Sequence, residues 1–185
     1  MRWRFLLPIL ALVSPAVATV AWLKGEPVAA FAPGQIYLVE FWATWCGPCI
    51  AGMPQLTRLQ AQMGDTVTVI GVDIWEEQSG VPYTDATRTR VERFVADNAA
   101  KLGYRVAYDG GAQRMAKAWM AAAGLNSIPN AFLVDRAGLI AYIGHPMGPE
   151  FRQALTQVIA GTHDLVATRA AHEQRRAAAV EDMAV

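Results

Sequence analysis

Trp45-Cys46-Gly47-Pro48-Cys49 contains both cysteines of this 185-residue chain, with two residues between them. A disulfide between Cys46 and Cys49 would close a loop too short to stabilise the fold much. A zinc ribbon would need a second pair of this kind, which a chain with two cysteines lacks. The spacing suits a pair that cycles between dithiol and disulfide. We therefore interpret the motif as a redox-active pair, and two incidental buried thiols are the alternative.

The residues around the motif predict a strand that runs into a helix. Tyr37-Leu38-Val39-Glu40-Phe41-Trp42 is a largely apolar, β-prone run, which is typical of a buried strand. Apolar residues recur with helical spacing over residues 49–63, and Gly64-Asp65 should end that helix. Cys46 then lies at the helix start, where backbone N–H groups and the helix dipole favour its thiolate. We expect Cys46 to be the exposed, attacking thiol and Cys49 the buried one.

Three segments carry a resemblance to a known family. Residues 39–49 (VEFWATWCGPC), Pro54 and the distant Ile128-Pro129 resemble the thioredoxin-like family. Within it, residues 41–46 (FWATWC) and 138–140 (GLI) are most similar to the exported thiol-disulfide oxidoreductases of the TlpA type. The resemblance extends from about residue 22 to about residue 161 and is most specific at the cysteine motif.

The resemblance implies an α/β fold in which helices cover both faces of a central mixed β-sheet. It also implies dithiol–disulfide exchange, in which Cys46 attacks a protein disulfide and Cys49 resolves the mixed disulfide. Gly47 and Pro48 are similar to the pair found in reducing members of the family, which favours a reductase. Ile128-Pro129 matches the family's cis-proline loop, whose free backbone groups bind an extended substrate as an added strand.

Other positions near the motif bear on substrate recognition. Trp45 lies beside the attacking sulfur, and we expect it to form part of an exposed apolar rim that receives substrate. Asn130 follows the cis-proline position where Thr is usual, which changes a contact on the substrate side. Gly52 lies three residues after Cys49, where Glu is common in relatives that serve cytochrome c maturation. Because Gly52 supplies no proton, its presence argues against specificity for haem apoproteins.

Glu40 is a carboxylate within the apolar strand, where it must be paired, hydrated or protonated. In the thioredoxin-like family an acid at this position lies behind the resolving cysteine, so the resemblance makes Glu40 the proton acceptor for Cys49. Desolvation would raise its pKa towards the range of a general base. Gly71 stands where the family often has a lysine, so Glu40 is expected to be less ionised than its counterparts. A hydrated carboxylate at a strand edge or end is the alternative.

The remaining chain alternates strands and helices, as in a sheet with crossover helices on both faces. The pattern predicts strands at 67–74 and 105–108, an amphipathic helix at 84–102, an Ala- and Met-rich helix at 112–123 closed by Gly124, a hairpin of 131–135 and 139–143, and a helix at 148–159.

The first residues predict export. Arg2 and Arg4 precede an apolar stretch at 5–13, and residues 14–18 contain an Ala-x-Ala cleavage pattern. Residues 1–18 therefore predict a bacterial secretory signal and a periplasmic or otherwise exported protein. An uncleaved membrane anchor over about residues 5–23 is the alternative, since an uncharged run of ~20 residues can span a bilayer. Residues 19–161 would form one thioredoxin-like domain, and 162–185 a charged, Ala-rich extension that is a solvated helix or a frayed end.

Composition excludes some classes of function. The chain has 16 Lys and Arg against 16 Asp and Glu, a net charge of +0, so no basic field attracts nucleic acid. His145, His163 and His172 lack the clustered spacing of a metal site, and we expect hydrogen-bonding or solvent-exposed roles for them. The resemblance requires no cofactor, and no metal is expected.

The sequence therefore predicts an exported protein-disulfide reductase that acts through Cys46 and Cys49. An exported reductase works in an oxidising compartment, so a membrane thiol–disulfide electron donor would have to restore its dithiol. One alternative is a disulfide oxidant or isomerase that uses the same residues at a higher reduction potential. Another is a binding module that holds a soft ion such as Cu(I) between the two sulfurs.

Overall fold

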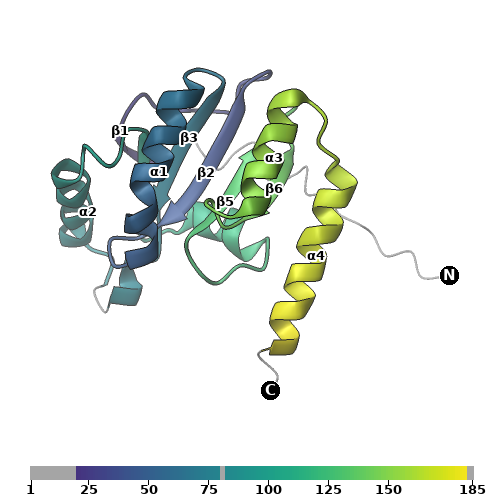
Figure 1. Ribbon diagram of the computed structural model, residues 1–185. Coiled ribbons are helices and arrows are strands. Elements are labelled where there is room, and N and C mark those ends of the chain that lie inside the picture. The colour runs from purple at the N-terminus through teal and green to yellow at the C-terminus, as the bar shows by residue number, and fades with distance from the viewer. Residues whose placement is uncertain (1–19, 80–81, 183–185) are drawn as a thin grey trace.

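The computed structural model describes residues 20–79 and 82–182 (Figure 1). The predicted signal at 1–18 lies outside these residues, as does most of the alternative anchor at 5–23. Within the described ranges, no helix is both long and apolar enough to cross a membrane.

A single six-stranded β-sheet forms the centre of the molecule, in the order β1-β4-β3-β2-β5-β6. β2 is parallel to β3 and antiparallel to β5, and β3 is parallel to β4, while β1 and β6 form the antiparallel edges. The sheet is therefore mixed, and the predicted strands and hairpin are confirmed. The strands are β1 (Ala21–Lys24), β2 (Ile36–Trp42), β3 (Val67–Asp73), β4 (Arg105–Tyr108), β5 (Asn130–Val134) and β6 (Ile140–Gly144).

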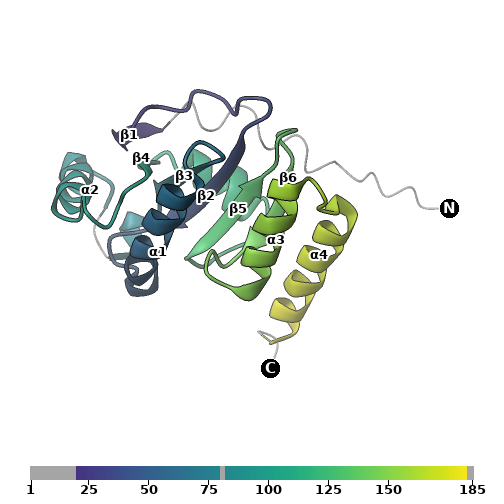
Figure 2. The same ribbon diagram turned by 45° about the horizontal axis from the view of Figure 1, so that its top comes forward.

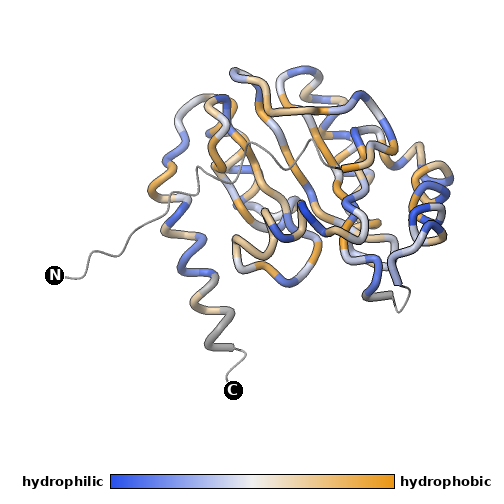
Figure 3. The backbone as a smooth tube through the Cα atoms, turned by 180° about the vertical axis from the view of Figure 1, so that it is seen from behind, coloured by the Kyte–Doolittle hydropathy of each residue, from blue (hydrophilic) through white to orange (hydrophobic). Residues whose placement is uncertain are grey.

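Helices cover both faces of the sheet, as the α/β prediction requires (Figures 1 and 2). One face packs against α1, α2 and α3 through a cluster that contains Leu38 and Trp42 of β2. The other face packs against η4 through a cluster that contains Val39 and Phe41. Hydrophobic residues follow the central strands, whereas α2 and α4 carry many hydrophilic ones (Figure 3). The helices are α1 (Gly47–Met63), η3 (Glu76–Ser79), α2 (Asp85–Asp97), η4 (Ala116–Ala121), α3 (Pro149–Ala160) and α4 (Leu165–Asp182).

Two helices differ from the sequence expectation. α2 is shorter than the predicted 84–102, because Asn98 caps it with its side-chain amide donating to Phe94 O at 3.0 Å. Local bonds of this kind compete with continued helix. The predicted helix at 112–123 contains a π-helical segment, η4, in which Ala122 N donates to Lys117 O at 3.3 Å. Gly124 closes it with a positive φ of 71°, as predicted.

The described part of the C-terminal segment is a helix and not a frayed end. Most of its described side chains are exposed, as expected for a solvated helix, but one side of the helix packs against the sheet, which was not expected. α4 lies alongside the edge strand β6 (Figures 1 and 2). Thr168 Oγ1 donates to Ala141 O at 3.0 Å and Arg175 Nη2 donates to Ile143 O at 2.9 Å. These bonds satisfy carbonyl groups that an uncovered edge strand would leave open. The division of the chain at residue 161 stays a prediction.

Replacing the two bonding side chains of α4 should weaken the fold. Thr168→Val with Arg175→Leu removes both bonds to β6, and we expect the free energy of unfolding to fall by about 1 to 3 kcal/mol. Urea denaturation measures the change. The control Glu173→Gln removes the exposed pair with Arg169, which should be worth less than about 1 kcal/mol. Equal stability of the double variant and the wild type would show that α4 does not stabilise the sheet edge.

Candidate active site

Cys46 and Cys49 are joined by a disulfide, with their Cα atoms 5.3 Å apart. Cys46 is the N-cap of α1, and its Sγ accepts a hydrogen bond from Cys49 N at 3.3 Å. Pro48 lies in the first turn of α1. Backbone N–H groups in a first turn have no acceptor within the helix, so the N–H that proline lacks costs no hydrogen bond there. No acidic residue lies in that turn. Peptide dipoles around the Cys46 sulfur therefore favour negative charge on it.

Both cysteines are buried in this disulfide form. Cys46 is 3% exposed and Cys49 is 1% exposed, so the expectation that Cys46 is exposed was wrong for this state. The reason is tertiary packing, because both cysteines belong to the buried cluster that fills this face of the sheet together with Leu38 and Trp42. Their order at the helix start is nevertheless the predicted one.

Trp45 projects beside the pair. It is 39% exposed, and its Nε1 donates to Trp75 O at 2.9 Å. Trp75 has a positive φ of 57°, a conformation uncommon for a bulky residue. The indole is thus held by one polar bond and stays partly exposed. Its part in a rim that receives substrate stays a prediction.

A buried ion pair fixes the chain just before the motif. Glu76 is 0% exposed; its Oε1 accepts from Thr44 N at 2.6 Å and its Oε2 accepts from Thr44 Oγ1 at 2.7 Å. Arg90 of α2 pairs with the same carboxylate. Because Thr44 lies two residues before Cys46, this network sets the direction in which the chain enters α1.

Asp73 lies beside this network, and sequence reasoning missed both acids. Asp73 is 0% exposed, and burial, together with the neighbouring Glu76, raises its pKa well above the ordinary value. The sequence signal was the acid-rich stretch 73–77 directly after a predicted strand. Only the pairing of β3 with β2, which places Trp42 opposite Asp73, brings that stretch to the motif.

Glu40 lies in the central strand β2 and is 1% exposed. Burial raises the pKa of its carboxyl from 4.5 to about 8, so the alternative of a hydrated strand-end carboxylate is excluded. Side chains alternate along a strand, and Leu38 and Trp42 belong to the same cluster as Cys46 and Cys49. Glu40 therefore faces the side of the sheet that carries the cysteines.

Gly71 is the neighbour of Glu40 on β3, as predicted. A Cβ atom at Gly71 would lie 2.9 Å from Cε2 of Tyr104 and 3.2 Å from Nε1 of Trp42. Aromatic rings therefore fill the space in which a lysine side chain would start. Tyr104 was missed from the sequence because only packing brings it to Glu40.

The Ile128–Pro129 peptide bond is cis, as the resemblance implies. Ile128 packs against the clusters on both faces of the sheet. Asn130 begins β5 opposite Phe41, and its Nδ2 donates to Ser127 O at 2.9 Å. The Asn130 side chain therefore braces the cis-proline loop.

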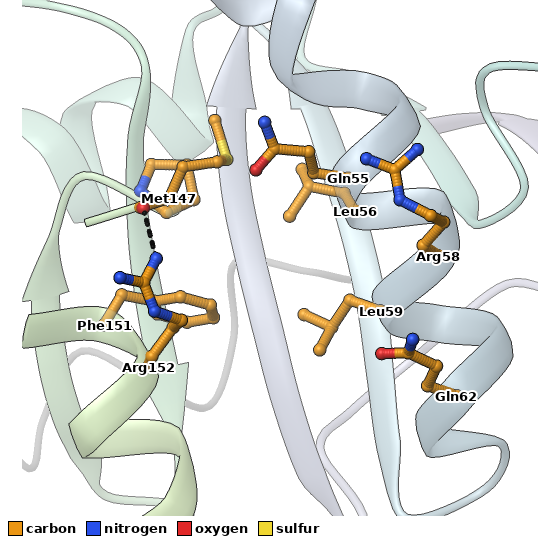
Figure 4. Close-up of a pocket in the computed structure, with 9 residues that line it drawn as sticks. Gln55, Leu56, Arg58, Leu59, Gln62, Met147, Phe151 and Arg152 are labelled. Carbon is orange, nitrogen blue, oxygen red and sulfur yellow. Dashed lines mark hydrogen bonds between the residues drawn. The ribbon is translucent and has the colours of Figure 1, made fainter. Parts of the chain in front are cut away.

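Met147 occupies the space beside Gly52. A Cβ atom at Gly52 would lie 2.3 Å from Cε of Met147, so an acidic side chain at position 52 would displace the thioether. Met147 also lines a groove of about 210 Å³ between α1 and α3, where Leu56 and Leu59 face Phe151 (Figure 4). Neither cysteine lines this groove, which separates it from the redox pair.

The three histidines make hydrogen bonds, as expected. His163 Nε2 lies 2.8 Å from Asp135 Oδ2, and His172 Nε2 lies 3.1 Å from Ala123 O. His145 Nδ1 accepts from Met147 N at 3.2 Å. His163 thus connects the segment between α3 and α4 to the turn after β5, His172 connects α4 to the turn after η4, and the bond of His145 is local.

Known proteins resemble this chain over most of its length. The family described as Redoxin matches residues 22–158. Protein FixW of Rhizobium leguminosarum is 32% identical over 132 residues, which cover 71% of this chain and 58% of FixW, so the chain spans less than two thirds of that relative. Thiol:disulfide interchange protein HelX of Rhodobacter capsulatus is 30% identical, over 75% of this chain and 74% of HelX. The crystal structure of StoA from Bacillus subtilis matches with a TM-score of 0.53 at 25% identity, over 76% of this chain and 99% of StoA.

The buried Glu40 should leave a signature in the pH dependence of stability. The folded protein holds a proton on Glu40 up to about pH 8, whereas the unfolded chain releases it near 4.5. The stability from this proton is complete below the lower value and is lost as pH rises towards the higher one. Glu40→Gln has no such proton, so its stability should rise relative to wild type between about pH 5 and pH 8, by up to roughly 3 kcal/mol.

Denaturation of the oxidised proteins across that pH range measures the difference between wild type and Glu40→Gln. The control is Glu92→Gln, which removes an exposed carboxylate paired with Arg88 and should show almost no pH-dependent difference. Parallel stability curves for wild type and Glu40→Gln would contradict the raised pKa.

Proposed function

The chain belongs to the redoxin family of thioredoxin-like proteins, and from that premise we propose that it is a thiol–disulfide oxidoreductase that reduces disulfides in exported proteins. The observation that carries the proposal is the Cys46–Cys49 disulfide at the N-terminus of α1. A disulfide across two residues adds little to stability, so its value to the protein lies in being opened and closed.

Reduction of a substrate starts from the dithiol form. The Cys46 thiolate attacks one substrate sulfur, the substrate S–S bond breaks, and the other substrate sulfur leaves as a thiolate and takes up a proton. The Cys49 thiolate then attacks Sγ of Cys46. The mixed disulfide breaks, the second substrate thiol is released, and the Cys46–Cys49 disulfide forms. Two electrons have passed from the pair to the substrate.

The start of α1 supports Cys46 as the attacking sulfur. Helix N-termini stabilise thiolates and lower the pKa of a cysteine placed there. The hydrogen bond from Cys49 N to Cys46 Sγ would strengthen when that sulfur carries charge. Cys49 lies one turn further into α1 and is not at the helix N-terminus, so its sulfur does not receive the same stabilisation.

Glu40 supports Cys49 in the second step. It faces the same side of the sheet as the cysteines, and its pKa of about 8 lies close to that of an ordinary thiol, about 8.5. Proton transfer between groups of matched pKa is efficient near that pH. In the proposed reaction Glu40 accepts the proton that Cys49 loses when it attacks.

Substrate recognition is assigned to the surface around the pair. Trp45 offers an exposed apolar face, and Gly47, Pro48 and the Ile128–Pro129 loop complete the proposed contact with the substrate backbone. A reductase that works outside the cytoplasm needs a supply of electrons, so the proposal includes a membrane thiol–disulfide donor. It also includes export through residues 1–18, with 19–161 as the catalytic domain and 162–185 as its extension.

A trapping experiment tests the order of the two sulfurs. Cys49→Ser should accumulate mixed disulfides with substrate proteins through Cys46, because attack still occurs while release does not. Non-reducing electrophoresis and mass spectrometry of the adducts detect them. Cys46→Ser with Cys49→Ser is the matched control and should form none. Equal adduct formation by both proteins would refute Cys46 as the specific attacking group.

A further inference from the structure

Three buried polar atoms on the face of the sheet that carries the redox pair have no hydrogen-bond partner among the described residues: Glu40 Oε2, Trp42 Nε1 and Tyr104 Oη. Glu40 is 1% exposed, Trp42 is 0% exposed and Tyr104 is 5% exposed. Buried polar groups in proteins are almost always hydrogen-bonded, to protein or to ordered water. Three such atoms in one region indicate a shared partner.

Gly71 is the common neighbour of the three side chains. Its backbone pairs with Glu40 across the parallel β2–β3 ladder. The Tyr104 ring and the Trp42 indole nitrogen lie at 2.9 Å and 3.2 Å from the position that a Cβ atom of Gly71 would take. Glu40 and Tyr104 also interact electrostatically, since the carboxylate adds to burial in raising the pKa of the Tyr104 hydroxyl.

The three atoms have complementary hydrogen-bonding capacity. The Trp42 indole N–H can only donate, an ionised Glu40 carboxylate can only accept, and the Tyr104 hydroxyl can do both. One water molecule accepts two hydrogen bonds and donates two, and a buried water typically makes about three. A water that accepts from Trp42 and Tyr104 and donates to Glu40 would satisfy all three atoms.

We propose that Glu40, Trp42 and Tyr104 form a site for one buried water, through which Tyr104 acts as a positioning residue for the Glu40 carboxylate. Hydrogen bonds to a carboxylate favour its charged form, so the site opposes the effect of burial and keeps Glu40 able to lose its proton near neutral pH. The water site itself does not depend on the proposed function; only its effect on proton transfer from Cys49 to Glu40 rests on that function.

Few other titratable or charged groups lie near Glu40 to change the pKa of its carboxyl. The titratable residues in the apolar cluster on this face, or packed against it, are the two cysteines and four tyrosines: Cys46, Cys49, Tyr83, Tyr104, Tyr108 and Tyr142. The flanking strand partners Gly71 and Ala131 do not titrate. α2 and α3 pack here through Val91, Val95, Phe151, Leu155 and Val158. The buried Thr87 of α2 does not titrate, and Arg90 of α2 pairs with Glu76.

Tyr104→Phe tests the site because it keeps the ring and removes the hydroxyl. Carboxyl ¹³C NMR of the oxidised protein follows the titration of Glu40, whose resonance is identified by its loss in Glu40→Gln. We expect Tyr104→Phe to raise the proton affinity of Glu40 about 3- to 10-fold and to move the pH midpoint of substrate release upward by the same factor. Tyr108→Phe is the matched control, because Tyr108 belongs to the same buried cluster and its nearby acids are Asp73 and Glu76.

The outcomes separate this inference from the proposed function. An unchanged or lowered proton affinity of Glu40 in Tyr104→Phe would overturn the water site. An equal change in Tyr108→Phe would overturn it too, because the effect would then come from general packing. A raised affinity in Tyr104→Phe alone supports the site. If the release profile does not follow that rise, the site stands and the proposed catalytic part of Glu40 is contradicted.

Discussion

β2 lies in the middle of the sheet with all seven of its residues buried, and the chemistry of the protein depends on this constraint. A strand with no solvent face desolvates any carboxylate that it carries, so Glu40 has a pKa of about 8. The same strand ends at Trp42, four residues before Cys46. The direction of β2 therefore fixes where α1 starts and places the Cys46 sulfur at the N-terminus of that helix.

Aromatic residues replace charge around this buried acid. The rings of Tyr104 and Trp42 pack against Gly71, so no cation lies next to Glu40 on β3. A nearby cation would lower the pKa of the carboxyl, whereas an apolar surrounding raises it. The resulting pKa lies near that of a thiol, and a group of this kind exchanges protons with cysteine near neutral pH. A second buried acid, Glu76, accepts hydrogen bonds from Thr44 and so fixes the path of the chain just before Cys46.

Local sequence was sufficient for much of the fold and for the centre of the site. The strand, the helix start and the cysteine spacing lie within one stretch of chain, and the resemblance supplied the distant cis-proline. The contacts of Glu76 with Thr44, of Tyr104 with Gly71 and of Met147 with Gly52 could not be predicted, because each joins segments that only the sheet order brings together. The burial of Cys46 and the docking of α4 were missed for the same reason, since both depend on packing and not on periodicity.

The claim that this pair reduces its substrates depends on the equilibrium between Cys46, Cys49 and their disulfide. The Gly47-Pro48 pair, similar to that of reducing relatives, predicts a reduction potential near that of thioredoxin, about −270 mV. The measurement is equilibration of the protein with glutathione buffers of known potential, followed by alkylation and mass analysis of the reduced fraction. A value near −270 mV agrees with a reductase. A value near −120 mV, typical of the strongest disulfide oxidants, would contradict it.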